Sequence, residues 1–477
     1  MSSRTTEFRL LTLAGCAAAL VPRLAHRGMF LDGVTYASIA RNLAEGRGRF
    51  WEPFYTATIY PAFHEHPPLA FWLQSLWFRV LGDHWYVERV YCLVAAMLMA
   101  ALLALTWRAV YAPPVHDTRE HRERDADDWL PIALWMLAPV VSWSIVGNLL
   151  ETTVCVFVTA AVAAIAIGSR APAAAAIVTG CASGLCIAGA VLSKGPVGFF
   201  PLAAPVIMAV LPDRRRSSLW SAAGQWTMVA LCAVVLYRAP SARDSLSTYV
   251  DQQIITALAG QREVSGSSIT IVIALLQGVW LPMTLAIALV VAAARGWVRP
   301  TSRDRQVAIV FTLIGLAGTL PMLVSPKQTG HYLMPAVPFY AIGAAALVAE
   351  TVDTLARRLS KGRGVFAIRI LTAAVALVGL VAIWLPAVER DPMRLADLDR
   401  LAAVAPRGET VGICPSANGD WMLHAWMQRR FLVSLDAAEP HSHEWFLKSP
   451  DIAADCPPSM CVPISEPGGE LMLMRCR

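Results

Sequence analysis

Long apolar runs recur along most of the chain and are separated by shorter polar stretches. A helix needs about 20 mainly apolar residues to cross a bilayer, so the pattern predicts an all-α polytopic membrane protein with about eleven spans. The expected spans lie near residues 8–26, 89–110, 129–147, 151–168, 173–192, 195–212, 219–237, 269–293, 307–324, 333–350 and 366–386. Very short turns join 129–147 to 151–168 and 173–192 to 195–212, which predicts two tight helical hairpins.

One stretch, residues 27–88, is too polar to cross a bilayer and too aromatic to be an ordinary loop. It contains two amphipathic segments, VTYASIARNLAEG at 34–46 and AFWLQSLWFRVLG at 70–82, which predict helices lying on the membrane surface. A second polar loop, 238–268, contains a similar segment, YVDQQIITALAG. We expect the two loops to lie on the same side of the membrane and to form a cavity there.

The sequence changes character after residue 386. TVGICPS and FLVSLD have the composition of short strands, and DWMLHAWMQRRF between them is amphipathic with a helical period. MCVPIS and GELMLMRC are candidates for two more strands. The chain is therefore predicted to divide into a membrane domain at 1–386 and a small α/β domain at 387–477.

The charge distribution predicts the orientation of these elements. Of the 477 residues, 56% are hydrophobic and only 16% are charged, the mean hydropathy is +0.51 and the net charge is +6. Lys and Arg gather in alternate short loops, which predicts that the N-terminus is cytoplasmic and that 27–88 and the tail are extracytoplasmic. We expect a multi-pass protein of the bacterial inner membrane. No basic stripe with interleaved aromatic residues indicates nucleic-acid binding.

The ten cysteines fall into two groups. Six lie inside apolar runs, where a free thiol behaves as a small hydrophobic side chain. The other four lie in the tail, at Cys414, Cys456, Cys461 and Cys476. If the tail is extracytoplasmic, one or two disulfides can form there, and four cysteines allow three pairings.

Asp32 follows the first apolar run closely, at the start of the first amphipathic segment. One interpretation is a helix N-cap, since Asp at that place accepts hydrogen bonds from backbone N–H groups. The other is a general base facing the extracytoplasmic side. The two interpretations are compatible, because a residue at a helix start can also exchange a proton.

FHEHPPL, at residues 63–69, holds three ionisable side chains together. Pro67 and Pro68 force the preceding residues out of helical geometry. His64 and His66 would then point the same way, with Glu65 opposite, and two imidazoles can bind a metal or a phosphate. The alternative is that the histidines are simply solvated, since metal sites usually have three or four protein ligands.

More ionisable residues are expected at the same membrane face, in turns between spans. They are Glu151, Lys194, Arg262, Lys327 and His331. Each alone could be a side chain whose charged end reaches the interface. Together with Asp32 they supply a base for an acceptor and cations for a phosphate leaving group, as cleavage of a lipid phosphate–sugar bond requires.

These stretches resemble the polytopic GT-C glycosyltransferases that use polyprenyl-phosphate sugars, especially the lipid A aminoarabinose transferase branch and the protein O-mannosyltransferases. LDGVTYASIARNLAEG resembles the family's first acidic motif, HPPLAFWLQSLWFRVLG its Lys-Pro-Pro motif, and NLLETTVCVF its second acidic motif. SKGPVGFFP and KQTGHYLMPAVPFYAI resemble later motifs of the same face. The likeness covers about the first 350 residues.

The resemblance implies roles for individual residues. Asp32 would be the general base, and Glu151 would support it or coordinate a divalent metal; no other cofactor is implied. The donor and its phosphate would be held by Tyr36, Glu65, His66, Lys194, Arg262, Lys327, His331 and Tyr332. This chain has His66 where the family has Lys and Glu151 where it has Asp, and Gly33 stands where a second acid is frequent.

The function expected is transfer of a sugar, a hexose or a pentose, from a polyprenyl-phosphate donor to a lipid, glycan or protein acceptor, with inversion at the anomeric carbon. One alternative is a transporter or flippase of a lipid-linked or polar solute, which predicts ionisable residues at the bilayer midplane and broken helices. Another is a membrane scaffold whose tail binds a partner.

Overall fold

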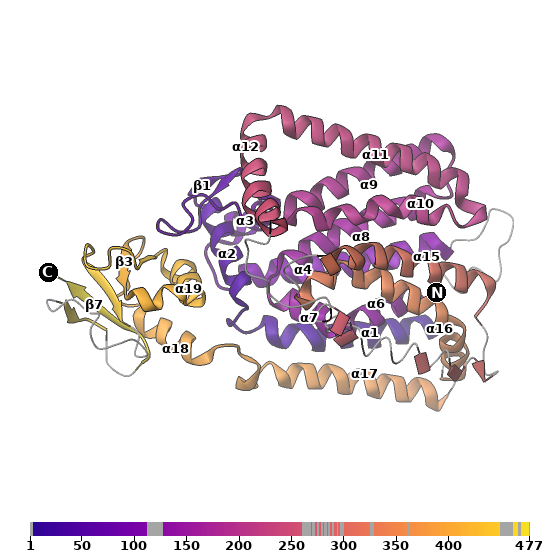
Figure 1. Ribbon diagram of the computed structural model, residues 1–477. Helices are drawn as coiled ribbons and strands as arrows, with labels where there is room; N and C mark the ends of the chain where they lie inside the picture. Colours follow the sequence, from indigo (N-terminus) through magenta and orange to yellow (C-terminus); the bar gives the residue numbers. More distant parts are fainter. Residues whose placement is uncertain are drawn as a thin grey trace. The chain divides into compact units, whose positions relative to one another are not determined.

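The computed structural model describes residues 3–111, 127–259, 300–324, 329–359, 362–448, 461–465 and 469–476, together with scattered positions between 269 and 295 (Figure 1). Contacts divide the chain into two compact units. Unit 1 comprises residues 1–23, 92–146 and 150–384, and unit 2 comprises residues 24–91, 147–149 and 385–477. Each unit is described by itself.

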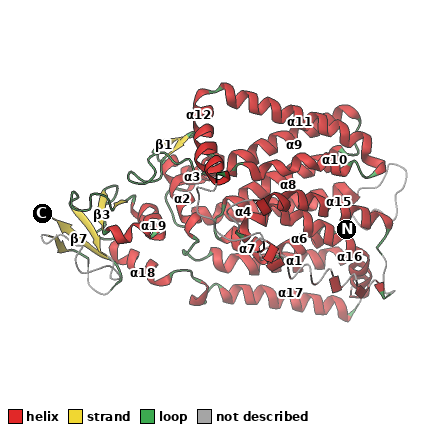
Figure 2. Ribbon diagram, viewed as in Figure 1, coloured by secondary structure: helices red, strands yellow, loops and turns green. Residues whose placement is uncertain are grey.

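Unit 1 is helical throughout its described residues (Figure 2). In the part of the chain that the structure describes, seven helices are long and apolar enough to cross a membrane, as expected of a multi-pass membrane protein. Its elements, which include the few residues of α1 and α4 that belong to unit 2, are α1 (Ser3–Leu24), α4 (Val87–Tyr111), α6 (Trp129–Met136), α7 (Pro139–Val146), α8 (Leu150–Gly168), α9 (Ala173–Lys194), η1 (Pro196–Ala203), α10 (Ala204–Met208), η2 (Pro212–Arg214), α11 (Arg215–Arg238), α12 (Pro240–Tyr249), η3 (Val250–Ile255), α13 (Thr256–Leu258), α15 (Ser302–Thr319), η4 (Leu320–Val324), η5 (Gly330–Ala336), α16 (Val337–Leu359) and α17 (Arg363–Ala382).

Two predicted spans are not single straight helices. The 129–147 span is broken into α6 and α7, which meet at an angle of 76°. The 195–212 span begins as the 3₁₀ helix η1 and continues as the short helix α10. Proline explains both breaks, because Pro139, Pro201 and Pro205 have no N–H to donate and their rings clash with the preceding turn. The 269–293 span lies outside the described residues apart from scattered positions, and the count of eleven stays a prediction.

Helices α8, α9 and α11 run side by side in unit 1 (Figure 1). Small residues allow the close approach of α9 and α11. A Cβ atom added at Gly180 would lie 2.1 Å from the carbonyl oxygen of Ser221, so only glycine fits there. Packing of this kind is what holds helices together in a bilayer, where burial of apolar surface gives little gain.

The described residues of unit 2 combine four α-helices and two short 3₁₀ helices with a five-stranded sheet and a small hairpin (Figure 2). Its elements are α2 (Leu31–Ala44), β1 (Gly48–Arg49), β2 (Glu52–Pro53), α3 (Leu69–Leu81), η6 (Pro386–Val388), α18 (Pro392–Leu401), β3 (Thr410–Ile413), η7 (Pro415–Gly419), α19 (Trp421–Phe431), β4 (Ser434–Asp436), β5 (Trp445–Lys448), β6 (Cys461–Pro463) and β7 (Met472–Cys476). The two longest helices of the segment 24–91, α2 and α3, lie where amphipathic helices were predicted. Their position on a membrane surface stays a prediction.

The sheet of unit 2 has the strand order β4-β3-β5-β7-β6. Strands β3 and β4 are parallel, and Val411 pairs with Leu435. Parallel neighbours need a crossover connection, and α19 supplies it. Strands β5 and β7 are antiparallel, as are β7 and β6. The four predicted strands are confirmed, whereas β5 was not predicted.

The tail and the segment 24–91 share one hydrophobic core. Val34 and Ala37 of α2 pack in the same cluster as Leu423 and Met427 of α19, and all four are buried. The predicted boundary at residue 387 therefore does not coincide with the boundary of unit 2. Helix α2, which carries Asp32 in its first turn, packs against α19 and the C-terminal sheet.

Disulfides hold the sheet of unit 2. Cys461 and Cys476 face each other on β6 and β7 and are joined by a disulfide. Cys414, just after β3, is disulfide-bonded as well. Disulfides were predicted for the tail, and this structure gives one of the pairings in full.

Candidate functional site

Glu151, Lys194 and His331 meet in unit 1, although they are far apart in the sequence. Glu151 lies in the first turn of α8, and Lys194 is the last residue of α9. The Lys194 ammonium donates a hydrogen bond to Glu151 Oε1. His331, in η5, places its Nε2 atom 3.6 Å from the same oxygen. We call these three residues, together with Trp143 and Tyr332, the Glu151 cluster.

Aromatic rings enclose the charged atoms of the Glu151 cluster. The Lys194 ammonium lies 4.5 Å from the centre of the Tyr332 ring. The His331 ring lies 4.6 Å from that of Tyr332 and 5.4 Å from that of Trp143. A cation held over an aromatic face is attracted by the ring quadrupole. The rings therefore stabilise positive charge beside the carboxylate and exclude water from one side.

Burial makes the Glu151 cluster unlike a surface ion pair. The side chain of Glu151 is 1% exposed, that of His331 10% and that of Lys194 11%. Glu151 Oε2 is buried and accepts no hydrogen bond from the described residues. Buried polar atoms almost always have a partner, so an unsatisfied carboxylate oxygen calls for an explanation. A hydroxyl group or a cation of a bound substrate would satisfy it.

The turn after α9 fixes the position of Lys194. Gly195 has φ +89°, and a Cβ atom there would lie 2.1 Å from the Tyr249 hydroxyl oxygen. The Tyr249 hydroxyl in turn donates to the Lys194 carbonyl oxygen over 3.3 Å. Only glycine can adopt this backbone and leave this space. The sequence SKGP thus places the lysine at a sharp turn that α12 supports.

Asp32 lies in the first turn of α2 in unit 2. The interpretation of Asp32 as the N-cap is wrong, because Phe30 occupies that position and α2 already begins at Leu31. A carboxylate in the first turn is stabilised by the positive end of the helix dipole. Its side chain is neither fully buried nor fully exposed, so it is accessible for proton transfer.

Tyr36 lies one helical turn after Asp32 on α2, and His66, in the loop before α3, contacts it. The Tyr36 hydroxyl is 3.2 Å from His66 Nε2, and the Tyr36 ring packs against Phe71. His66 precedes Pro67 and Pro68 and lies outside a helix, as predicted from the two prolines. Tyr36 and His66, which were both predicted to hold the donor, are thus brought together by the structure.

The two histidines of FHEHPPL have different surroundings. Glu65 Oε1 accepts a hydrogen bond from Tyr60 over 3.0 Å. Burial lowers the pKa of His64, with Glu52 opposing the effect. Within the described residues no group of three or more His, Cys, Asp and Glu side chains is arranged to hold a metal. The described residues thus supply no third ligand beside His64 and His66, and the metal site stays a prediction.

Asn148 is a residue of the site that the sequence analysis missed. It has φ +54°, and its side-chain amide donates to the Gly33 carbonyl oxygen over 2.9 Å. Its Oδ1 atom accepts from Gln74 over 2.7 Å. Asn148 therefore ties the first turn of α2, next to Asp32, to α3. The Gly-Asn pair at 147–148 was the available signal, because Asn is one of the few residues that tolerate this conformation.

A buried arginine holds the far end of α2. Arg41 is buried and donates to the Gln428 carbonyl oxygen over 2.7 Å and to Asp83 over 3.2 Å. Arg429 donates to the other oxygen of Asp83 over 2.6 Å. Burial would raise the pKa of Asp83, but Arg429 and Arg41 hold it below its usual value. Burial lowers the pKa of Arg41 to about 10. This network fixes α2 against α19.

The structure gathers the predicted site residues into two sets. Asp32, Tyr36, His64, Glu65 and His66 belong to unit 2. Glu151, Lys194, His331 and Tyr332 belong to unit 1. Arg262 and Lys327 lie outside the described residues.

No protein-family model matches the chain, and no curated protein matches it. Solved structures do. ArnT from Cupriavidus metallidurans, bound to undecaprenyl phosphate, is 15% identical; the match covers 98% of this chain and 97% of that chain, with a TM-score of 0.66. The same protein in the apo state is 16% identical over 99% and 98% of the two chains, with a TM-score of 0.67.

A second similar structure is archaeal. The oligosaccharyltransferase AglB from Archaeoglobus fulgidus, in complex with an inhibitory peptide and a dolichol-phosphate, is 12% identical. The match covers 93% of this chain and 69% of that chain, with a TM-score of 0.51.

These likenesses identify the class of fold. Both neighbours are membrane glycosyltransferases of the GT-C type, and the resemblance predicted from the sequence is confirmed at the level of the fold. The ArnT fold is the better match, because it extends over nearly the whole of both chains.

Proposed function

We propose that the protein is an integral membrane glycosyltransferase that transfers a sugar from a polyprenyl-phosphate donor to an acceptor hydroxyl on the extracytoplasmic face. The observation that carries the proposal is the match over 98% of the chain to an ArnT structure that holds undecaprenyl phosphate. The buried Glu151 cluster adds a site with unsatisfied hydrogen-bonding capacity.

The chemistry proposed is a single displacement. The acceptor oxygen attacks the anomeric carbon while the bond between that carbon and the phosphate oxygen breaks, and the bonding electrons leave with the phosphate. The acceptor proton goes to the Asp32 carboxylate, and the anomeric configuration inverts. Asp32 suits this role because it is a carboxylate in the first turn of a helix that Asn148 and Gln74 hold in place.

The phosphate that leaves gains negative charge, so cations must stabilise it. In the proposal Lys194 supplies that charge and His331 supplies a hydrogen-bond donor, both within unit 1. His66 stays a candidate for a further contact to the phosphate. Glu151 orients Lys194 through the hydrogen bond that joins them, and its Oε2 atom accepts from a sugar or acceptor hydroxyl. Arg262 and Lys327 stay candidates for further contacts to the phosphate. The sugar, hexose or pentose, is left open.

Two features support an extracytoplasmic active side. Disulfides persist in oxidising compartments, and the Cys461–Cys476 disulfide belongs to unit 2, which also contains Asp32. Within unit 1, Arg108, Arg170 and Arg214 lie near the helix ends opposite to Glu151, as expected of the cytoplasmic side. The inner membrane of a bacterium is the location proposed.

One observation favours the alternative that the protein is a transporter. The 76° break between α6 and α7 is the kind of discontinuous helix that transporters use. The ionisable residues, however, lie at helix ends: Glu151 begins α8 and Lys194 ends α9. Ionisable groups at one end of the helices fit chemistry at a membrane surface better than passage through it.

The test is consumption of a panel of radiolabelled polyprenyl-phosphate sugars by the purified full-length protein. Wild type is compared with Asp32→Asn and with Asp244→Asn, an exposed aspartate on α12 that serves as the control. We expect one donor to be consumed, with turnover reduced at least about 100-fold in Asp32→Asn alone. A folded wild-type protein that neither binds nor consumes any donor, or an Asp32→Asn variant that turns over normally, would overturn the proposal.

A further inference from the structure

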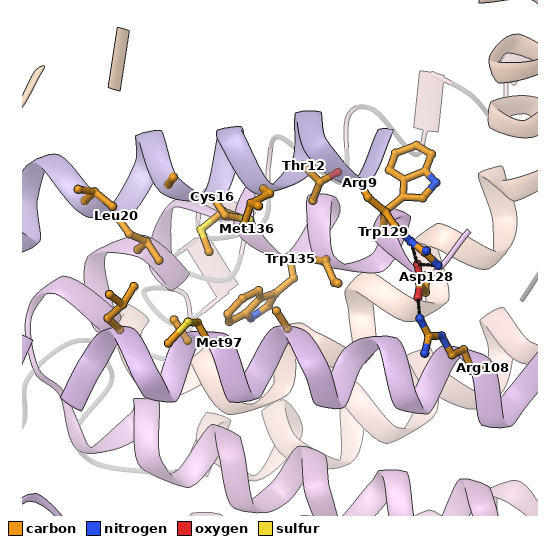
Figure 3. A pocket seen from close by; sticks show the side chains of 17 residues that line it. Arg9, Thr12, Cys16, Leu20, Met97, Arg108, Asp128, Trp129, Trp135 and Met136 are labelled. Carbon is orange, nitrogen blue, oxygen red and sulfur yellow. Dashed lines mark hydrogen bonds and ion pairs between the residues drawn. The ribbon is translucent and has the colours of Figure 1, made fainter. Parts of the chain in front are cut away.

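A groove runs along unit 1 between α1 and α4, with α6 closing one side (Figure 3). Its cavity volume is about 450 Å³, within the range of ligand pockets. Apolar side chains line nearly all of it, among them Leu13, Leu20, Met97 and Met136. A groove of this composition fits hydrocarbon.

The groove ends in a charged group. Arg9 Nε donates to Asp128 Oδ1 over 2.9 Å, and Arg108 donates to the other oxygen of Asp128. Figure 3 shows the two arginines reaching Asp128 from opposite walls of the groove. The side chain of Asp128 is 5% exposed, but those of Arg9 and Arg108 are 28% and 51% exposed. One carboxylate is shared by two arginines, so the group of Arg9, Asp128 and Arg108 carries one positive charge in excess.

This charged end lies far from the Glu151 cluster. Val110, two residues after Arg108, accepts a hydrogen bond from Arg170 over 3.3 Å, and Arg170 follows the last turn of α8. Glu151 lies in the first turn of the same helix. The 19 residues of α8 separate the two ends by about 28 Å. An occupant of this groove would therefore have its head group at the opposite end of unit 1 from Glu151.

The lining also contains an unsatisfied donor. The side chain of Trp135 is fully buried, and its Nε1 atom has no hydrogen-bond partner within the described part of the chain. Trp135 lines the apolar groove. An acyl chain brings an ester carbonyl that can accept from an indole N–H, whereas a plain hydrocarbon chain brings no acceptor.

We propose that the groove between α1, α4 and α6 is a binding site for an anionic glycerophospholipid, which lays one acyl chain along the apolar walls and its phosphate between Arg9 and Arg108. Charge complementarity selects the occupant. A head group with net negative charge balances the excess arginine, and at the same end Arg170, Arg214 and Arg303 outnumber Asp213 and Asp304. A zwitterionic lipid brings a cation of its own to the same place. The bound lipid fastens α1 to the rest of unit 1.

The test measures lipid retention by native mass spectrometry of the full-length protein, with dioleoyl-phosphatidylglycerol and dioleoyl-phosphatidylcholine as probes. Ala100→Phe fills the groove, and Ala101→Phe is its control, since Ala101 is exposed and does not line the groove. Arg108→Gln removes one arginine, and Arg216→Gln removes an exposed arginine of α11 as the matched control.

We expect wild type, Ala101→Phe and Arg216→Gln to retain about fivefold more phosphatidylglycerol than phosphatidylcholine. Ala100→Phe should retain neither lipid. Arg108→Gln should retain phosphatidylglycerol and phosphatidylcholine in a ratio close to one. If Ala100→Phe does not fold, the test is the comparison of lipid preference between Arg108→Gln and Arg216→Gln. Equal retention of both lipids, full retention by folded Ala100→Phe, unchanged preference in Arg108→Gln, or displacement of phosphatidylglycerol by undecaprenyl phosphate would overturn the proposal. None of these outcomes depends on sugar transfer.

Discussion

Two clusters of unit 1, each built on one carboxylate with two basic side chains, lie toward opposite ends of α8. In the first, Glu151 is contacted by Lys194 and His331, and all three are at most 11% exposed. In the second, Asp128 is contacted by Arg9 and Arg108, which are 28% and 51% exposed. Both clusters consist of one carboxylate and two basic side chains. The side chains of the first cluster are much more buried than the arginines of the second.

Burial decides what each cluster can do. Charges taken out of water interact strongly with one another, and breaking such a pair leaves an uncompensated buried charge. Solvent-exposed ion pairs contribute little to stability, because water and salt screen the attraction between their charges. The Glu151 cluster is therefore suited to act on a substrate that replaces water, and the Arg9–Asp128–Arg108 group is suited to exchange partners with a lipid head group.

The largest effect is expected from Lys194→Met. The change leaves the Glu151 carboxylate buried with only His331 beside it. The free energy of unfolding should fall by about 3–5 kcal/mol, as for other broken buried pairs. Chemical unfolding of the purified protein in detergent measures it. A loss below about 1 kcal/mol would mean that water reaches the cluster and that its burial does not matter.

A smaller effect is expected from Gly195→Ala, which disturbs the turn that positions Lys194. Its positive φ costs about 1–2 kcal/mol in any residue with a Cβ atom, and the contact with Tyr249 adds to that cost. Gly46→Ala is the matched control, because Gly46 has φ +77° and nothing lies within 4 Å of the added atom. Gly195→Ala should unfold more easily than Gly46→Ala. Equal losses would show that Tyr249 moves aside freely.

In unit 2, the contacts of Asp83 with Arg41 and Arg429 should make the free energy of unfolding depend on pH. Because Arg429 and Arg41 lower the pKa of Asp83 in the folded protein, its contribution to stability is complete above about pH 4 and is lost as the pH falls through the lowered value. Urea unfolding at pH 6, 4 and 3 measures this loss. Asp83→Asn should flatten the profile, and Glu409→Gln, an exposed control, should not. An identical profile in Asp83→Asn would refute the assignment.

The smallest effect is expected from Asp128→Asn. Both arginines can turn to water when the carboxylate is lost, so the free energy of unfolding should change by no more than about 1 kcal/mol. The measurement is the same chemical unfolding used for Lys194→Met. A loss as large as that of Lys194→Met would remove the contrast between the two clusters.

Local patterns predicted much of the fold. The helical period of 70–82 and the apolar spacing of the tail predicted α3, α19 and four of the five strands of the large sheet. Strand β5 was missed because WFLK is short and lies among polar residues. The breaks at Pro139 and Pro201 were missed because apolar length alone cannot distinguish a straight span from a kinked one.

Long-range contacts of the site could be predicted only in part. The sequence placed Glu151, Lys194 and His331 at one membrane face, since each follows or precedes an apolar run. It could not show that they touch, because 43 and 180 residues separate the pairs and contact depends on helix packing. The support of α2 by α19 through Arg41 was equally invisible, because it joins residues 387 positions apart.

The most direct test of the account is the turnover of a stable variant that lacks the buried pair. Glu151→Gln combined with Lys194→Met removes both charges and should recover most of the unfolding free energy that Lys194→Met loses. The account predicts that this double variant, although stable, consumes the polyprenyl-phosphate sugar at least about 100-fold more slowly than wild type. A stable double variant with wild-type turnover would contradict the account and show that the pair serves the fold alone.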